Sequence, residues 1–322
     1  MKTQKLDKNI KADGGKKTAG GNLREQLALQ SMVIPGLLLI FIFAYIPLMG
    51  IVVAFKDYNL YNGILASPWV GLKHFKAFFF GRNFLQIMRN TIVISGLKLI
   101  FGFPAPIILA VLLNEIANIK NRKVFQTITY MPHFVSWVVV AGMLNTLLSV
   151  DGGTINSILK GLGLIDEPIN FLSNPNYFWT ILVSANVWKS TGFNAIIFMA
   201  AISGINPELY EAASLDGASR FKQIFVITLP SILTQIVIVL ILNVSNILNA
   251  GLDDILLLTN NGDNSILMSV ADVIDTYVYR IGIKAQRFSF ATAAGVFKSV
   301  VNILMLLAAN GISRRFGEVS LW

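Results

Sequence analysis

Long apolar stretches, separated by shorter polar segments, dominate the chain. A helix needs about 20 apolar residues to cross the hydrocarbon core of a membrane, and six stretches approach this length. All of them are far longer than an ordinary strand. The pattern therefore predicts an all-α integral membrane protein with six transmembrane helices: Val33–Phe55, Thr91–Leu113, Val124–Leu148, Phe178–Ser203, Ser231–Leu252 and Ser289–Gly311.

The composition agrees with a membrane protein. Of the 322 residues, 54% are hydrophobic and 13% are charged, whereas soluble domains carry about 25% charged residues. The chain has no cysteine, which excludes a disulfide framework and metal thiolates. The first apolar stretch follows a polar tail and has no small-residue cleavage site after it, so it is not predicted to be a cleaved signal. We predict a basic tail with an interfacial helix in residues 1–30 and a membrane domain in residues 31–322.

The distribution of charge predicts the orientation. Fourteen of the 26 Lys and Arg residues lie in the tail and the three other segments predicted to be cytoplasmic. This bias places both termini in the cytoplasm. The lysine-rich tail is interpreted as a topology signal near anionic membrane lipid rather than as a nucleic-acid site. From Asn22 to Met32 the pattern favours an amphipathic helix on the inner membrane face.

Three lysines lie within the predicted spans, where no acidic residue is found. Lys98 and Lys298 lie nearer the outer surface, and we expect their side chains to extend toward it. Lys189 lies near the middle of the membrane. Two alternatives remain for the group that Lys189 binds: an anionic uronic acid or the carbonyl groups at a helix end.

The segment 204–230 is a polar loop with an unusual pattern. Asn206 and Pro207 predict a helix start, because Asn caps helices and Pro is tolerated at the first position. This helix should end near Gly217, which permits a left-handed bend. A second short helix, Ser219–Ile227, would carry Phe221 and Phe225 on one side. An ordinary connection is shorter than this, so the loop is predicted to dock a partner.

This loop resembles the EAA loop of binding-protein-dependent ABC importer permeases. From about residue 30 onward the whole chain resembles the LplB-type sugar importer permeases, within the MalF/MalG-like type I group with the MetI-like fold. The resemblance rests on seven phrases: Tyr45–Tyr58, Gly102–Glu115, Tyr130–Val140, Asn206–Ala213, Ala271–Arg280, Phe288–Val301 and Gly317–Trp322.

The resemblance implies a function and a set of partners. Such a permease pairs with a second permease subunit, a dimer of ABC ATPases that bind ATP and Mg, and an extracytoplasmic solute-binding protein. It lies in the bacterial cytoplasmic membrane and imports oligosaccharides or polysaccharide fragments. Glu211 corresponds to the glutamate that meets a basic group in the ATPase cleft. The residues that match the coupling motif are Glu211, Ala212, Ala213, Asp216, Gly217, Ala218, Phe221, Ile227, Leu229 and Pro230.

The sequence offers no nucleotide site or catalytic site of its own. The phosphate-binding pattern Gly-x4-Gly-Lys-Ser/Thr is absent; the nearest imitation, Gly14–Thr18, has the wrong spacing. His74 and His133 are the only histidines, and His133 is interpreted as a packing residue. We therefore expect a transporter subunit without cofactor or metal, not an enzyme, with ATP hydrolysed by a separate subunit.

Polar residues within spans are costly and tend to face a cavity or another helix. Asn and aromatic side chains suit a sugar, because amides bind hydroxyl groups and a flat ring covers the apolar face. Hydrogen bonding between helices is the alternative interpretation. An ion-coupled transporter or a channel subunit is a second class, but it would be expected to show acidic residues in the spans or a filter loop. The candidate substrate path is Trp137, Asn145, Asn186, Trp188, Lys189, Ser190, Asn194, Asn243, Asn246 and Asn249.

Overall fold

The structure is a computed structural model that describes residues 19–315 of the chain. The lysine-rich tail and the phrase Gly317–Trp322 lie outside the described residues. Within them the chain is helical and forms no β-sheet; an isolated antiparallel bridge joins Lys56 and Trp69. The predicted all-α class is confirmed. The chain divides into two compact units, residues 1–52 and 53–322.

The first unit is one long apolar helical segment. It contains α1 (Ala19–Ile40), a π-helix (Phe41–Tyr45) and α2 (Ile46–Leu48), and a 3₁₀-helix (Met49–Phe55) leads into the second unit. The interfacial helix predicted for Asn22–Met32 is not a separate element. It runs without interruption into the first predicted span, because no glycine or proline separates the two.

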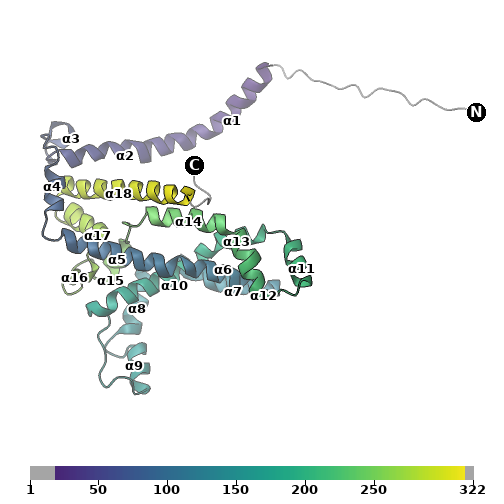
Figure 1. Cartoon of the computed structure of the whole chain (residues 1–322). Coiled ribbons are helices and arrows are strands. Elements are labelled where there is room, and N and C mark those ends of the chain that lie inside the picture. Colours follow the sequence, from purple (N-terminus) through teal and green to yellow (C-terminus); the bar gives the residue numbers. More distant parts are fainter. Residues whose placement is uncertain (1–18, 316–322) are drawn as a thin grey trace, which may run out of the picture. The chain divides into compact units, whose positions relative to one another are not determined.

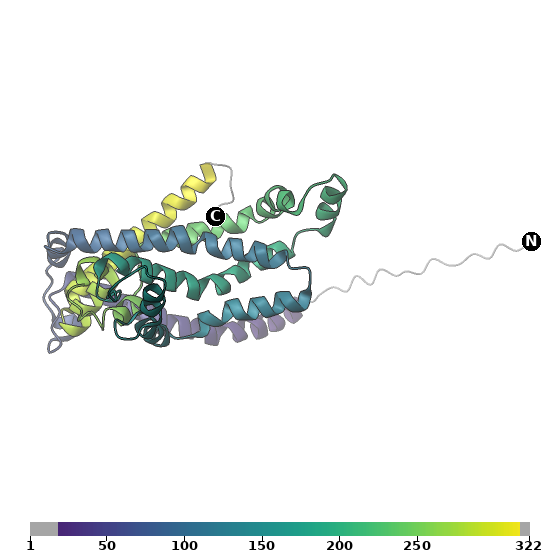
Figure 2. The ribbon, with the colours of Figure 1, turned by 90° about the horizontal axis from the view of Figure 1, so that it is seen from below.

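The second unit contains the remaining helices, and the long helix α10 (Pro175–Ser203) packs against several of them. Figures 1 and 2 show this arrangement. The helices are α3 (Gly63–Ala66), α4 (Lys73–Phe79), α5 (Phe84–Gly102), α6 (Pro104–Asn114), α7 (Ile119–Phe134), α8 (Trp137–Leu148), α9 (Thr154–Gly161), α10 (Pro175–Ser203), α11 (Pro207–Leu215), α12 (Arg220–Gln223), α13 (Leu229–Ser231), α14 (Leu233–Ser245), α15 (Asp253–Leu258), α16 (Met268–Ala271), α17 (Ile274–Tyr279) and α18 (Phe288–Arg315), with π-helices Ile224–Thr228 and Arg280–Lys284.

Several of these helices are long and apolar enough to cross a membrane. In the described part of the chain, three helical stretches satisfy this by length and composition: Gln30–Phe55, Phe84–Asn114 and Phe288–Arg315. Two bent pairs of helices raise the number to five if each pair is one span. Helix α10 has 29 residues but is not one of these stretches. The exact count of six spans stays a prediction.

One predicted span, the third, is bent, and a second bend lies where the fifth begins. Helices α7 and α8 meet at an angle of 97°, because Pro132 lies in the last turn of α7 and the hydroxyl of Ser136 caps α8 by accepting from the Val139 N–H. The second bend, of 61°, lies at Ile232 between the helical segment Arg220–Ser231 and α14, next to the predicted start of the fifth span at Ser231.

The fifth span is also shorter than predicted. Helix α14 ends at Ser245, so the predicted helix through Leu252 is wrong over its last part. The side-chain amide of Asn246 donates to the Leu242 carbonyl at 3.0 Å and so occupies an acceptor at the helix end. The chain then continues as irregular structure through Gly251, whose φ is +114°.

The hydrophobic core of the second unit lies along α10. One cluster joins the N-terminal half of α10 to the segments around α15 and α16 and contains Leu182 and Ile255. Another joins its C-terminal half to α6 and Ile232 and contains Phe198. Figures 1 and 2 place α11–α13 at one end of this unit, beside the α6–α7 junction, and α15–α17 at the other end.

The expectation that Lys98 and Lys298 extend to the outer surface is wrong. The ammonium of Lys98 lies 2.5 Å from a carboxylate oxygen of Asp254, and Lys298 pairs with Asp275. Both aspartates belong to the segment after the fifth span, which folds back against α5 and α18. A buried charge is costly unless it is paired, so the pairing replaces the expected solvation.

A further ion pair joins the end of α16 to the segment after α17. Arg280 donates to both carboxylate oxygens of Asp272, at 3.1 and 2.6 Å. Burial raises the pKa of Asp272, and the hydrogen bond and charge of Arg280 oppose this rise. The pair fixes the turn between α16 and α17.

Candidate translocation cavity and coupling loop

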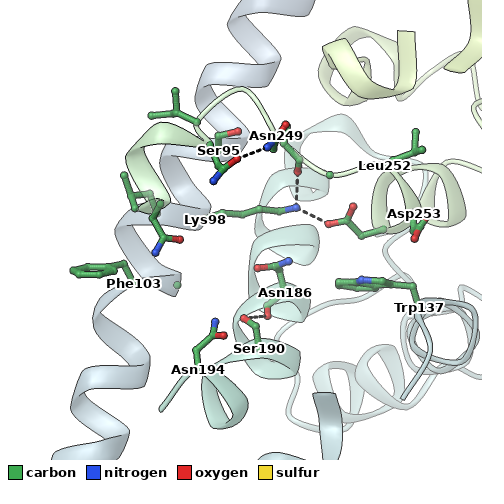
Figure 3. A pocket seen from close by; sticks show the side chains of 18 residues that line it. Ser95, Lys98, Phe103, Trp137, Asn186, Ser190, Asn194, Asn249, Leu252 and Asp253 are labelled. Atoms are coloured by element: carbon green, nitrogen blue, oxygen red, sulfur yellow. Dashed lines mark hydrogen bonds and ion pairs between the residues drawn. The ribbon is translucent and has the colours of Figure 1, made fainter. Parts of the chain in front are cut away.

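A polar cavity of about 380 Å³ lies where α5, α8, α10 and the end of α14 meet. Figure 3 shows Asn186, Ser190 and Asn194 along one helix, with Trp137 facing Lys98 across the cavity. The structure brings together most of the candidate substrate path in this cavity: Trp137, Asn186, Ser190, Asn194, Asn243, Asn246 and Asn249.

The amide groups around the cavity retain unused hydrogen-bonding capacity. Each Asn side chain has two N–H donors and an acceptor oxygen. Asn243 donates to the Val239 carbonyl at 2.8 Å, and Asn249 donates to the Asn246 amide oxygen at 2.7 Å. The side chains of Asn186 and Asn194 make no hydrogen bond within residues 19–315. The cavity wall therefore offers free donors and acceptors to a hydroxyl-rich ligand.

Lys189 lies in an adjoining cavity rather than in the first one. This second cavity has a volume of about 570 Å³ and shares Trp137 and Asp253 with the first. The Lys189 ammonium donates to the carbonyls of Val135 at 2.5 Å, His133 at 2.6 Å and Pro132 at 3.5 Å. Of the two predicted partners, helix-end carbonyls are the ones present. The imidazole ring of His133 stacks on Phe193 with ring centres 3.9 Å apart, as expected of a packing residue.

Two other predicted path residues lie elsewhere. Asn145 lines a third cavity of about 520 Å³, near the end of α8. Trp188 is half exposed on α10 and lines none of these three cavities.

Three charged residues of the cavity wall, Lys98, Asp253 and Asp254, are not among the predicted path residues. The predicted fifth span continues to Leu252 and so leaves Asp253 and Asp254 in the segment after it. The signal that was available is the run of asparagines before Gly251, which favours an early helix end.

The coupling loop has the local structure that its sequence predicts. The Asn206 side chain accepts from the Glu208 N–H at 3.1 Å at the start of α11. Gly217 has φ +74° and ends the first helix, and Ser219 caps α12. The rings of Phe221 and Phe225 lie 4.9 Å apart and are exposed.

The rest of the predicted coupling residues divide between an exposed surface and an anchor. Leu229 packs against the core cluster of α6 and α10, and Arg220 lies 3.5 Å from Glu115 at the end of α6. The loop is thus held on the helical unit by its last part. Glu211, Ala212, Asp216, Gly217 and Pro230 are exposed, while Ala213, Ala218 and Ile227 are half-buried.

The family of the chain follows from comparison with known proteins. Residues 102–318 match the family model "Binding-protein-dependent transport system inner membrane component". The chain belongs to this family. The permease is 42% identical to the protein LplB of Bacillus subtilis, over 97% of this chain and 98% of LplB. It is also 42% identical to the polygalacturonan/rhamnogalacturonan transport system permease protein YteP of the same organism, over 93% and 92% of the two chains.

Solved structures give the same result. The permease superposes on a chain of a bacterial ABC transporter that imports the acidic polysaccharide alginate, with a TM-score of 0.82 and 41% identity over 91% of this chain and 97% of that chain. In the alginate transporter complexed with its pentasaccharide-bound periplasmic protein, the values are 0.83 and 40%, over 93% and 98%. The protein is therefore a membrane-embedded permease subunit of an ABC importer, and not an enzyme.

Proposed function

We propose that this permease imports oligosaccharides or polysaccharide fragments through the asparagine-lined cavity, as half of a translocation pathway. The observation that carries the proposal is the convergence of unpaired amides and Trp137 in one cavity. Amides bind sugar hydroxyl groups, and the indole ring offers an apolar surface for the face of a sugar ring.

The open wall of the cavity indicates that another subunit supplies the second half of this pathway. The cavity is open on one side, and exposed apolar side chains such as Phe101, Ile108 and Leu112 cover α5 and α6. A second permease subunit would close the pathway, as in a heterodimer. YteP belongs to a polygalacturonan/rhamnogalacturonan transport system, and the alginate transporter is complexed with a pentasaccharide-bound periplasmic protein, so we assign a solute-binding protein to the outer end.

The coupling loop is the proposed docking site of a separate ATPase dimer, which would bind ATP and Mg. Its exposed groups, Glu211 and the ring pair Phe221–Phe225, offer a charge and an apolar contact, while Leu229 anchors the loop to the core. A movement of the docked loop would then be transmitted through α13 to α14. From the Lys/Arg bias of the sequence we assign α11–α13 and both termini to the cytoplasm, and the chain to the bacterial cytoplasmic membrane.

Two experiments test the proposal. Mild solubilisation and copurification should recover a second permease and an ATPase with the tagged chain, and the complex in proteoliposomes should take up oligosaccharides only with ATP. Glu211→Lys should abolish uptake at normal chain levels, whereas Glu167→Lys, an equally exposed change in the outer segment, should not. ATP-independent uptake, or full uptake by Glu211→Lys, would contradict the coupling role.

A further inference from the structure

The charged groups around the cavities differ in how many of their hydrogen-bonding positions are already used. Four charged residues line the first and second cavities: Lys98, Lys189, Asp253 and Asp254. Their formal charges cancel. The hydrogen bonds within the protein decide which of these charges a substrate meets.

Both lysines are largely satisfied by the protein. An ammonium group has three N–H donors, and Lys189 directs them at three backbone carbonyls. Lys98 donates to the Ala250 carbonyl at 2.6 Å and to Asp254 at 2.5 Å, and its side chain is 14% exposed. Since Asp254 neutralises Lys98 directly, little positive charge is left for an anionic ligand.

Asp253 is different. Its side chain makes no hydrogen bond or ion pair with any residue from 19 to 315, and it lines both cavities at the point where they adjoin. A carboxylate is an acceptor at both oxygens, and hydrogen bonds to a charged group are stronger than those between neutral groups. The free charge of the pathway wall is therefore negative.

We propose that Asp253 is a specificity-determining residue that accepts hydrogen bonds from the hydroxyl groups of an uncharged sugar ring and disfavours a uronic acid carboxylate at that position. The proposal rests on the proposed saccharide function of the cavity. The Lys98–Asp254 pair supports the proposal, because a lysine that is already paired does not bind the carboxylate of a substrate. Repulsion between two carboxylates a few ångströms apart gives this selection its physical basis.

The test uses the reconstituted transporter and a mixture of neutral and uronic-acid-containing short oligosaccharides from plant and algal polysaccharides. Mass spectrometry of the sugars that enter the vesicles with ATP gives an acidic-to-neutral uptake ratio. Asp253→Asn keeps the size of the side chain and removes its charge, and it should raise this ratio about tenfold. The binding protein is the same in every sample, so a change in the ratio reports the permease.

Two further variants complete the design. Asp166→Asn removes the same charge from an exposed outer position that lines none of the cavities, and it should leave the ratio unchanged. Asp253→Ala removes the acceptor as well as the charge and should lower neutral uptake about tenfold.

The outcomes separate the two proposals. A change of less than about twofold in the ratio for Asp253→Asn, with active transport, would overturn the role of Asp253, and so would unchanged neutral uptake by Asp253→Ala. If the wild-type complex takes up no oligosaccharide with ATP, the saccharide function itself fails, whatever the variants do.

Discussion

The ammonium group of Lys189, on α10, lies 2.6 Å from the carbonyl oxygen of His133, at the end of α7. A helix end leaves carbonyl groups without a partner within the helix, and these carry a partial negative charge. The lysine therefore satisfies the backbone at the point where the third span bends. One side chain makes the broken helix compatible with its apolar surroundings.

Replacing this lysine should destabilise the bend. Lys189→Met keeps the apolar stem but leaves the carbonyls of His133 and Val135 without their donor. Hydrogen bonds to a charged group contribute about 1.5–3 kcal/mol, so we expect a loss of about this size. It should appear as a lower thermal unfolding midpoint of the purified permease in detergent. Lys160→Met, at an exposed lysine of α9, is the matched control; an equal midpoint for both variants would contradict the role of Lys189.

A second prediction concerns the pair Lys98–Asp254. The Asp254 side chain is 5% exposed, so Lys98→Met would leave a buried carboxylate without its counter-charge. Removing one partner of a buried pair costs about 3–5 kcal/mol, whereas replacing both by apolar residues is often neutral. The double variant Lys98→Met/Asp254→Leu should thus recover most of the loss. Unfolding midpoints of the wild type, both single variants and the double variant form the cycle, and additive losses would show that the two charges are not coupled.

Much of the fold and of the site could be predicted because local rules decide them. The apolar stretches indicate the helices, and the Asn206 cap and Gly217 determine the shape of the coupling loop. The polar side chains of Asn186, Ser190 and Asn194 recur along one helix at a spacing of about one turn, so their common face follows from the sequence.

The partners of the lysines did not follow from these rules. The Lys98–Asp254 pair joins residues 156 positions apart, and it depends on where the chain turns after α14. A hydropathy pattern cannot reveal that the segment after Ser245 folds back toward α5. Similarly, the acceptors of Lys189 are backbone carbonyls 54–57 positions away, and every residue has a carbonyl group, so no residue type marks the acceptors.

A third prediction concerns the contact between α7 and α10. A Cβ atom added at Gly192 would overlap the backbone carbonyl of Thr129, and a backbone atom moves only with its helix. Gly192→Ala should therefore separate the two helices and lower the unfolding midpoint strongly, with a cost of about 1–3 kcal/mol or more from overpacking. Gly96→Ala is the control, because the same atom at Gly96 meets nothing within 4 Å. Equal midpoints for the two variants would show that the helices are not in close contact here.

The last prediction concerns the bend of the coupling loop. Gly217 has φ +74°, and an added Cβ would meet no neighbouring atom within 4 Å, so a substitution there tests the backbone conformation alone. A left-handed conformation costs an L-residue about 1–2 kcal/mol, and Asn adopts it more readily than Ala. Gly217→Ala should therefore change the angle between α11 and α12 and reduce both ATPase copurification and uptake, while Gly217→Asn should retain more of each. Gly142→Ala, in the middle of α8, has the same open surroundings without the positive φ, and it should leave ATPase binding intact. If Gly217→Ala binds the ATPase as well as Gly142→Ala does, the left-handed bend is not what shapes the docking surface.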